Sequence, residues 1–394
     1  MDITVIGGGY AGLSCALRLA WRARKQGTPA RIRLLNPRSV LVERIRLHQA
    51  SAGQRLRPRR IDDLLRRCGV ELVAGKVEAV DRAARTIQVD GASMHWDRLV
   101  LAMGSRIARS DVPGAAEHTL APEPDTAGAV HNRFRSLQPG SHVAVVGGGL
   151  TAIESAGEIA EAFPHLRVHL VSREPVASGF GTRARRHVLD ALGRKLGVDV
   201  HEGVSVRSVS ATRLETSGGP IAFDACLWAA GFEPPPLPRQ LEVALDARGR
   251  ALVDGALRSL SDEAIYAVGD IASFRAPPGQ CVPMGCKSAM PMGAHAAENL
   301  ARELRGDAPA PFDYALLFYC VSLGRRDGLV QWADDEGNLT GRMLTGWRAA
   351  LFKEAICRST WWALKIEARG HRGVVWKRSG RATATVGLHD RQSA

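Results

Sequence analysis

A glycine-rich turn at the start of the chain constrains the fold more than any other feature. Residues 1–12 read MDITVIGGGYAG, with an apolar run before Gly7, Gly9 and Gly12 and a segment of helical composition after them. The first glycine permits a tight turn, the second lets the backbone approach a pyrophosphate, and the third allows the helix to pack close to the strand. We therefore predict an α/β fold that opens with a dinucleotide-binding unit.

The same pattern recurs in the middle of the chain. Residues 143–157 read VAVVGGGLTAIESAG, with Gly147, Gly149 and Ala152 at the three positions. Two such turns predict two bound dinucleotides and two Rossmann-like domains. We expect the first domain to be interrupted by the second: residues 1–115 and 237–310 form the first, residues 116–236 form the second, and residues 311–394 form a C-terminal region. The Pro-rich stretch 233–238 marks one crossing.

The residues that end the second strand of each unit bear on which nucleotide binds. The strand 31–35 ends at Asn36, where an acidic residue usually meets the adenosine ribose. Asn36 could hydrogen-bond that hydroxyl, or it could simply open the turn that continues with Pro37. The strand 166–171 ends at Ser172 and Arg173, and a hydroxyl followed by a guanidinium suits the 2′-phosphate of NADPH. The alternative is an ordinary Arg, since 46 of the 53 basic residues are Arg.

Composition bears on the partners and the cellular compartment of the protein rather than on its chemistry. The chain has 45% hydrophobic residues and a formal net charge of +13, which favours anionic cofactors, acidic proteins or anionic lipid as partners. Nucleic acid is disfavoured because there is no zinc finger or RNA-binding signature. The seven Cys residues lie mostly in apolar contexts, as is typical of a reducing cytoplasm. No signal peptide or long apolar span is evident, and no cluster of metal ligands stands out, so we expect no metal.

Five motifs together resemble a known superfamily. Their order is a glycine turn, the strand 97–104 (DRLVLAMG), the second glycine turn, the strand 223–231 (FDACLWAAG) and the stretch 265–270 (IYAVGD). This order resembles the two-dinucleotide-binding flavoprotein oxidoreductases over residues 1 to about 305. Within that superfamily the second turn, GGGLTAIESAGEI, is similar to the equivalent stretch of type II NADH dehydrogenases.

The resemblance implies that FAD binds the first unit and NADPH, or NADH, the second. It also implies that Glu154 is an acid near the nicotinamide, and that Asp270 receives a ribityl hydroxyl. The implied cofactor-binding residues are Gly7, Gly9, Tyr10, Ala11, Gly12, Asn36, Arg44, Val77, Ala102, Gly104, Gly147, Gly149, Thr151, Ala152, Ser172, Arg173, Ala230, Gly231, Gly269, Asp270 and Ala289.

The motifs leave the electron acceptor open. Type II NADH dehydrogenases carry paired Gln residues on a helix beside their quinone site, whereas this chain has Lys287 and Pro291 there. Lys287 could polarise an acceptor carbonyl as a catalytic residue, or it could be an ordinary helix-start lysine. Cys281 and Cys286 have the spacing of a redox pair, but a tight loop of small residues is the simpler interpretation.

Residues 347–394 form a basic tail that holds half of the eight Trp residues. Three placements are open: contact with an anionic membrane, packing on the flavin domain, or burial in a homodimer. We therefore expect a cytoplasmic FAD-dependent NAD(P)H dehydrogenase, either free or peripheral to the inner face of the membrane, that reduces a quinone-like or other small acceptor. A flavin oxidoreductase with a specialised organic substrate and a non-catalytic FAD-binding redox sensor are the alternatives.

Overall fold

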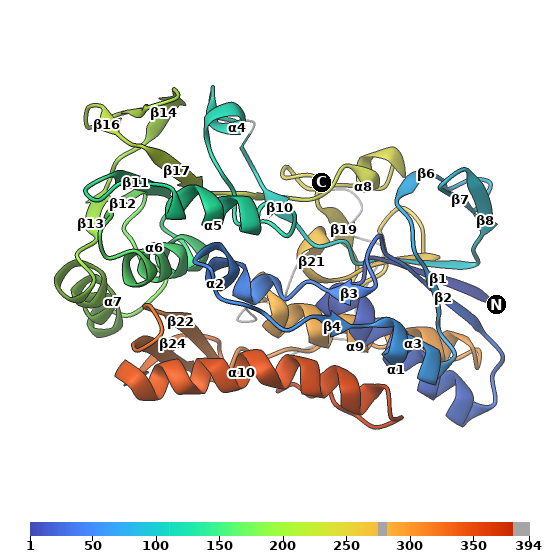
Figure 1. Cartoon of the computed structure of the whole chain (residues 1–394). Coiled ribbons are helices and arrows are strands. Elements are labelled where there is room, and N and C mark those ends of the chain that lie inside the picture. The colour runs from blue at the N-terminus through green and yellow to red at the C-terminus, as the bar shows by residue number, and fades with distance from the viewer. Residues whose placement is uncertain (110, 275–281, 381–394) are drawn as a thin grey trace.

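Two parallel sheets lie side by side in the computed structural model, which describes residues 1–109, 111–274 and 282–380 (Figure 1). The first sheet has the strand order β20-β9-β1-β2-β5 and the second has the order β13-β12-β11-β17. The α/β fold class expected from the two glycine turns is confirmed.

The first sheet is built around the N-terminal strand. Its strands are β1 (Asp2–Ile6), β2 (Arg31–Leu35), β5 (Glu71–Val73), β9 (Arg98–Leu101) and β20 (Ile265–Ala267), and all pairings are parallel. The return of the chain at β20 pairs Ile265 with Leu99, which lies 166 positions earlier in the chain. Helices α1 (Tyr10–Gln26) and α9 (Cys286–Glu303) pack together closely, since a Cβ on Gly293 would lie 2.0 Å from the carbonyl oxygen of Ala11.

The second sheet follows the same plan. Strands β11 (His142–Val146), β12 (Arg167–Ser172), β13 (Asp199–Glu202) and β17 (Ala225–Trp228) pair in parallel, and α6 (Leu150–Ala162) follows the second glycine turn. Helices α5 (Ala127–Arg135) and α7 (Thr182–Asp190) also belong to this body. The apolar runs of β11 and β17 are buried, as expected for strands covered on both faces.

Short elements connect and extend the two bodies. There are three small antiparallel sheets among the described residues. The first holds β6 (Val77–Asp81), β7 (Thr86–Val89) and β8 (Ala92–His95), and the second holds β14 (Val206–Val209), β15 (Arg213–Thr216) and β16 (Ile221–Ala222). The third holds β22 (Phe318–Ser322), β23 (Gly328–Ala333) and β24 (Leu339–Thr345). The remaining pairs are β3 (Val40–Leu41) with β4 (Arg59–Arg60), β10 (Arg106–Ile107) with β18 (Phe232–Glu233), and β19 (Ala251–Val253) with β21 (Ala272–Phe274). Short helices are α2 (Leu47–Ser51), α3 (Asp62–Cys68), α4 (Ala115–His118) and α8 (Leu237–Gln240), with helical turns at Arg44–Arg46, Ala191–Lys195 and Gly269–Ile271.

Two neighbouring strands of the first body belong to different sheets. Strand β5 joins the parallel sheet and β6 joins an antiparallel one. The break falls at Gly75, where a Cβ would lie 2.5 Å from a Val89 side-chain carbon. A residue without a side chain therefore lets the chain change sheets.

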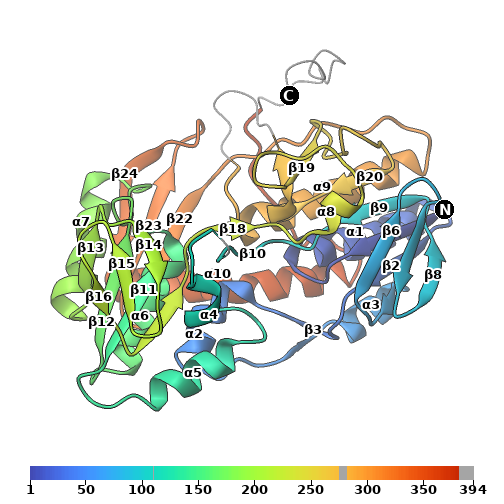
Figure 2. The same ribbon diagram turned by 90° about the horizontal axis from the view of Figure 1, so that it is seen from above.

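The C-terminal helix spans both bodies. Helix α10 (Gly346–Glu367) runs along one side of the molecule beneath β22, β24 and α9 (Figure 1), and Figure 2 shows it crossing between the two bodies. Trp361 and Leu364 are buried in the core that holds the first sheet. Of the three placements considered for the tail, packing on the first body is therefore observed for the C-terminal part of α10, around Trp361 and Leu364.

Candidate functional site: a central cavity between two nucleotide cradles

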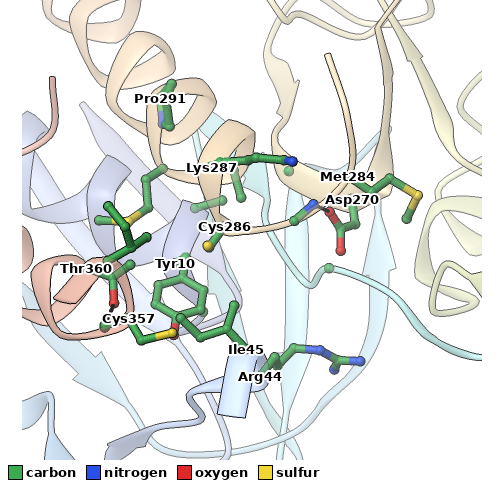
Figure 3. Close-up of a pocket in the computed structure, with 18 of the residues that line it drawn as sticks. Tyr10, Arg44, Ile45, Asp270, Met284, Cys286, Lys287, Pro291, Cys357 and Thr360 are labelled. Atoms are coloured by element: carbon green, nitrogen blue, oxygen red, sulfur yellow. Dashed lines mark hydrogen bonds between the residues drawn. The ribbon is translucent and has the colours of Figure 1, made fainter. Parts of the chain in front are cut away.

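A cavity of about 930 Å³ lies where the two bodies and α10 meet. We call it the central cavity. It is lined from the first glycine turn by Gly7 and Gly9, from α6 by Thr151 and Glu154, and from α10 by Lys353. Figure 3 shows part of its wall, with Tyr10 and Cys286 from the first body facing Cys357 and Thr360 of α10. Its volume is in the range of cofactor and substrate sites.

The first glycine turn has the geometry that a pyrophosphate needs. Gly7 has φ of 109°, and a Cβ there would lie 2.6 Å from the Ala102 carbonyl oxygen. A Cβ on Gly12 would lie 1.9 Å from the Gly7 carbonyl oxygen. Gly9 differs, because a Cβ there would meet no described atom within 4 Å. Gly7 and Gly12 are thus required by the turn itself, whereas Gly9 leaves open space in front of the N-terminus of α1, where amide N–H groups attract anions.

Polar groups complete the cradle in the first body. The Asp270 carboxylate accepts hydrogen bonds from the Ser105 hydroxyl at 3.1 Å and from the Gly285 N–H at 2.9 Å. Both contacts fix its orientation toward the cavity that it lines. The Asn36 side chain accepts the Gly8 N–H at 2.9 Å and donates to the Arg38 carbonyl at 2.6 Å. Asn36 therefore holds the turn and lines the cavity at once, so the two interpretations of this residue are compatible. An open glycine turn, a fixed carboxylate and a long cavity fit a flavin dinucleotide.

The second glycine turn repeats this geometry. Gly147 has φ of 137°, and a Cβ there would lie 2.9 Å from the Ala229 carbonyl oxygen, whereas a Cβ on Gly149 would meet no described atom within 4 Å. At the end of β12, the Ser172 hydroxyl is buried and donates to the Glu174 carbonyl at 2.6 Å. Arg173 is 77% exposed and lies 3.4 Å from the Glu174 carboxylate. Of the Ser172–Arg173 pair, only Arg173 therefore presents its side chain to solvent.

A buried charged cluster lies at the α6 side of the cavity. Glu154 forms an ion pair with Lys353 of α10, and its Oε1 also accepts the Ser322 N–H at 3.0 Å. The other carboxylate oxygen, Oε2, lies 3.6 Å from His48 Nδ1. Burial lowers the pKa of Lys353 to about 8, and a nearby Arg46 charge adds to that effect. Lys353 is therefore poised to exchange a proton near neutral pH.

Lys287 lies at the start of α9, on the opposite wall. Its ammonium stands 3.3 Å from the centre of the Tyr319 ring, a cation–π contact that fixes the side chain inside the cavity. Cys286, Cys320 and Cys357 also line the cavity. Burial raises the pKa of the Cys286 and Cys320 thiols to about 12, so reactive thiolates are disfavoured there. Cys281, the other half of the spacing noted in the sequence, lies outside the described residues.

The structure brings most of the candidate residues to one place. Those that line the central cavity are Gly7, Gly9, Tyr10, Ala11, Asn36, Arg44, Ala102, Gly104, Thr151, Glu154, Gly269, Asp270, Lys287 and Ala289. Gly12, Val77, Gly147, Gly149, Ala152, Ser172, Arg173, Ala230 and Gly231 are not among its lining residues. Gly12 packs instead against the Gly7 carbonyl within the turn, Val77 begins β6, and the others belong to the second glycine turn or follow the ends of β12 and β17.

The sequence patterns did not single out Lys353, and they did not predict the contact between His48 and Glu154. Three of the seven Lys residues, Lys287, Lys353 and Lys377, line the cavity in a chain that otherwise uses Arg. That rarity is a signal available in the sequence, because Lys can lose a proton at neutral pH when buried and Arg cannot. Across residues 1–109, 111–274 and 282–380 no metal-ligand group of three is found, and no helix is long and apolar enough to cross a membrane.

The first glycine turn opens onto the central cavity and a second turn repeats its geometry, an arrangement typical of oxidoreductases that pair FAD with a nicotinamide nucleotide. The chain belongs to the pyridine nucleotide-disulphide oxidoreductase family, whose model matches residues 1–298. It is 33% identical over 324 residues to an NADH dehydrogenase-like protein of Mycobacterium tuberculosis, a match that covers 77% of this chain and 80% of that protein. It is 25% identical over 391 residues to the type II NADH:quinone oxidoreductase of Staphylococcus haemolyticus, covering 90% and 93% of the two chains.

Solved structures share the fold over almost the whole chain. The sulfide:quinone oxidoreductase of Aquifex aeolicus superposes with a TM-score of 0.79 at 19% identity, covering 95% of this chain and 92% of that one. NDH2 from Plasmodium falciparum, solved with NADH, has a TM-score of 0.76 at 14% identity, covering 95% and 99%. At these identities the likeness concerns the fold. The expected superfamily and its resemblance to NADH dehydrogenases are thus confirmed.

Proposed function

We propose that this chain is an FAD-dependent NAD(P)H dehydrogenase that reduces an apolar, quinone-like acceptor. One observation carries the choice of acceptor. The central cavity extends from the first glycine turn to a rim of apolar side chains that are themselves exposed: Leu317, Trp362, Ile366 and Val375. An exposed apolar rim leading into a cavity suits a ligand that arrives from an apolar phase. Quinone-reducing relatives support the same acceptor class.

Residues of the first body would bind FAD and face the acceptor. Gly7 and Gly9 would receive the FAD pyrophosphate at the N-terminus of α1, and Asp270, fixed by Ser105, would accept a ribityl hydroxyl. The chemistry that FAD would supply in this cradle is hydride acceptance from the nicotinamide and electron delivery to the acceptor. Lys287 would lie beside the acceptor or the flavin ring as a positive charge.

The Glu154–Lys353 pair would supply the proton that the acceptor needs. Reduction of a two-electron acceptor A follows NAD(P)H + H⁺ + A → NAD(P)⁺ + AH₂, so one proton enters from the medium in each turnover. Lys353 lines the cavity, is buried, and has its pKa lowered by burial to about 8. The carboxylate of Glu154 stabilises its ammonium form, which makes Lys353 the donor and Glu154 its counterion.

For the second cradle we propose NADPH as the preferred nucleotide. The support is Arg173, which is exposed at the end of β12 without a neighbouring acidic residue at position 172. The guanidinium would meet the 2′-phosphate. The side chain of Ser172 contributes to the loop rather than to this contact, because its hydroxyl is bonded to the Glu174 carbonyl.

We further propose that the exposed side of α10 rests on an anionic membrane. Trp347, Leu351 and Trp362 are 64%, 62% and 56% exposed, at positions that recur on one helical face. Arg348 and Lys365 flank them and stack on Trp347 and Trp362. An apolar stripe with adjacent cations is typical of helices that lie in a membrane interface.

An anaerobic titration tests the dehydrogenase assignment. The purified holoprotein is mixed with NADPH or with NADH, and the absorbance of oxidised flavin is followed before and after a soluble quinone is added. We expect bleaching by NADPH, faster than by NADH, and recovery with the quinone. Bleaching without recovery would favour a specialised organic substrate, and no bleaching by either nucleotide would leave only a non-catalytic FAD-binding role.

A further inference from the structure

His48 faces Glu154, the counterion of the candidate proton donor Lys353, at the carboxylate oxygen that Lys353 does not bind. It lies in α2, which packs against α5 and α6, and its side chain is 3% exposed. Its Nδ1 lies 3.6 Å from Glu154 Oε2, while Lys353 and the Ser322 N–H both bind Oε1. The two carboxylate oxygens of Glu154 therefore have separate partners, and His48 is the one described for Oε2.

The surroundings of His48 determine its protonation state. Burial lowers its pKa well below the usual value, and the charges of Lys353, Arg325 and Arg46 lower it further, so the imidazole is neutral near pH 7. A neutral imidazole carries one hydrogen. Nε2 has no hydrogen-bond partner among the described residues, whereas Nδ1 faces a carboxylate. The hydrogen therefore belongs on Nδ1, pointing at Glu154.

The groups that face His48 come from every neighbouring element. Glu154 comes from α6, Lys353 from α10, Arg325 from the turn before β23 and Arg46 from the turn before α2. From α5, His131 lies against Gly53 just beyond the end of α2. Arg46 and Arg325 are themselves paired with Glu354, yet together with Lys353 they oppose a positive charge on His48. A neutral donor is the form that this site accommodates.

We infer that His48 is a positioning residue for acceptor reduction: it donates Nδ1–H to Glu154 Oε2 and thereby keeps Glu154 ionised and aimed at Lys353. This inference rests on the proposed function of the Glu154–Lys353 pair. A short movement of less than 1 Å would bring the 3.6 Å contact within hydrogen-bond distance. Without the donor, Glu154 would become protonated at higher pH and Lys353 would lose its counterion.

Two variants of His48 separate donation from mere packing. His48→Leu removes the donor, whereas His48→Asn keeps an N–H close to the position of Nδ1. Ser51→Ala is the matched control, since Ser51 is buried on the same helix and its hydroxyl has no partner among the described residues. The measurement is the rate of flavin reoxidation by a soluble quinone, as a function of pH. In His48→Leu we expect the acid limb to move upward by about one pH unit, with His48→Asn and Ser51→Ala close to wild type.

A second readout does not depend on activity. In holoprotein labelled with ¹⁵N-histidine, the His48 signals are those absent from His48→Asn, and we expect the Nδ1–H tautomer at pH 7. An Nε2–H tautomer, or equal pH shifts in His48→Asn and His48→Leu, would overturn the inference. If wild type fails to reduce any quinone, the proposed function fails, while the tautomer still reports whether His48 donates to Glu154.

Discussion

The Arg18 guanidinium and the Glu367 carboxylate form a fully buried ion pair between the first helix of the chain and the last. Arg18 Nε donates to Glu367 Oε2 at 3.2 Å, and the side chains of Arg18 and Glu367 are 2% and 0% exposed. The same carboxylate accepts the Trp21 indole N–H at 3.0 Å and the Val374 N–H at 2.8 Å. The pair therefore anchors both the end of α10 and the segment after it, which lines the central cavity.

Glu367→Gln should destabilise the protein by about 3 kcal/mol, because it leaves Arg18 buried without its main counterion. Urea unfolding followed by tryptophan fluorescence measures this. The matched control is Glu71→Gln, which removes an exposed partner of Arg31 and should cost less than about 1 kcal/mol. Equal losses in the two variants would contradict the structural role assigned to Glu367.

Gly9→Ala and Gly149→Ala should separate the two cofactor sites. A Cβ at either position meets no described atom within 4 Å, and both residues have φ of −83°, so both variants should fold. Each new methyl group would occupy the space where a pyrophosphate approaches. We expect Gly9→Ala to weaken FAD binding about tenfold or more, and Gly149→Ala to keep FAD but raise the KM for the nicotinamide nucleotide. Flavin content and steady-state kinetics give the two readouts.

Arg173→Ala should change nucleotide preference and little else. Its loss should raise the KM for NADPH about tenfold while leaving that for NADH unchanged, since only NADPH carries the 2′-phosphate. Arg167→Ala, an exposed Arg at the start of the same strand, is the control and should leave both values as they are. A parallel rise for both nucleotides in Arg173→Ala would argue against a 2′-phosphate contact.

The hydrogen bonds of Glu354 predict that the protein loses stability in acid. Arg46 donates to both of its oxygens at 2.9 Å and Arg358 donates at 2.8 Å. Burial opposes ionisation, but these hydrogen bonds lower the pKa of Glu354 to about 2 from 4.5. Because the folded pKa lies below the unfolded one, the stabilisation is present above about pH 4.5 and is lost as the pH falls toward 2.

Glu354→Gln should therefore cost about 2 kcal/mol at pH 7, after allowance for its partial exposure, and should flatten the pH dependence of unfolding below pH 4.5. The comparison is Glu215→Gln, which removes an exposed partner of Arg213. Unfolding midpoints measured from pH 2 to pH 7 test the prediction. An unchanged acid slope in Glu354→Gln would show that other carboxylates dominate.

The exposed stripe on α10 predicts membrane binding. A Trp347→Ser, Leu351→Ser double variant removes two large apolar side chains that are exposed in the monomer, so it should fold normally. Its affinity for vesicles that contain anionic lipid should fall about tenfold or more. Sedimentation with anionic and with neutral vesicles measures this. If wild type does not sediment with either, and elutes as a dimer that the double variant loses, the stripe is a subunit interface.

Much of the first body was predictable because its signals are local. The glycine turns, the strand Arg31–Leu35 and the helix that begins near Cys286 each follow from short patterns of apolar residues and glycines. The candidate residues near those turns were found for the same reason. Fourteen candidates line one cavity, and this number includes the two catalytic candidates Glu154 and Lys287. Their roles remain predictions that the variants above address.

The sequence by itself determined the class of protein, because strand, glycine turn and helix are neighbours in the chain and their geometry depends on no distant contact. Only the tertiary structure decided what surrounds Glu154. Lys353 and His48 lie about 200 and 100 residues away from it in the chain, and no local pattern relates them. They meet because α10 returns across both bodies and because the buried Arg18–Glu367 pair anchors its end. A buried charge becomes chemically significant through its neighbours, and those neighbours exist only once the chain has folded.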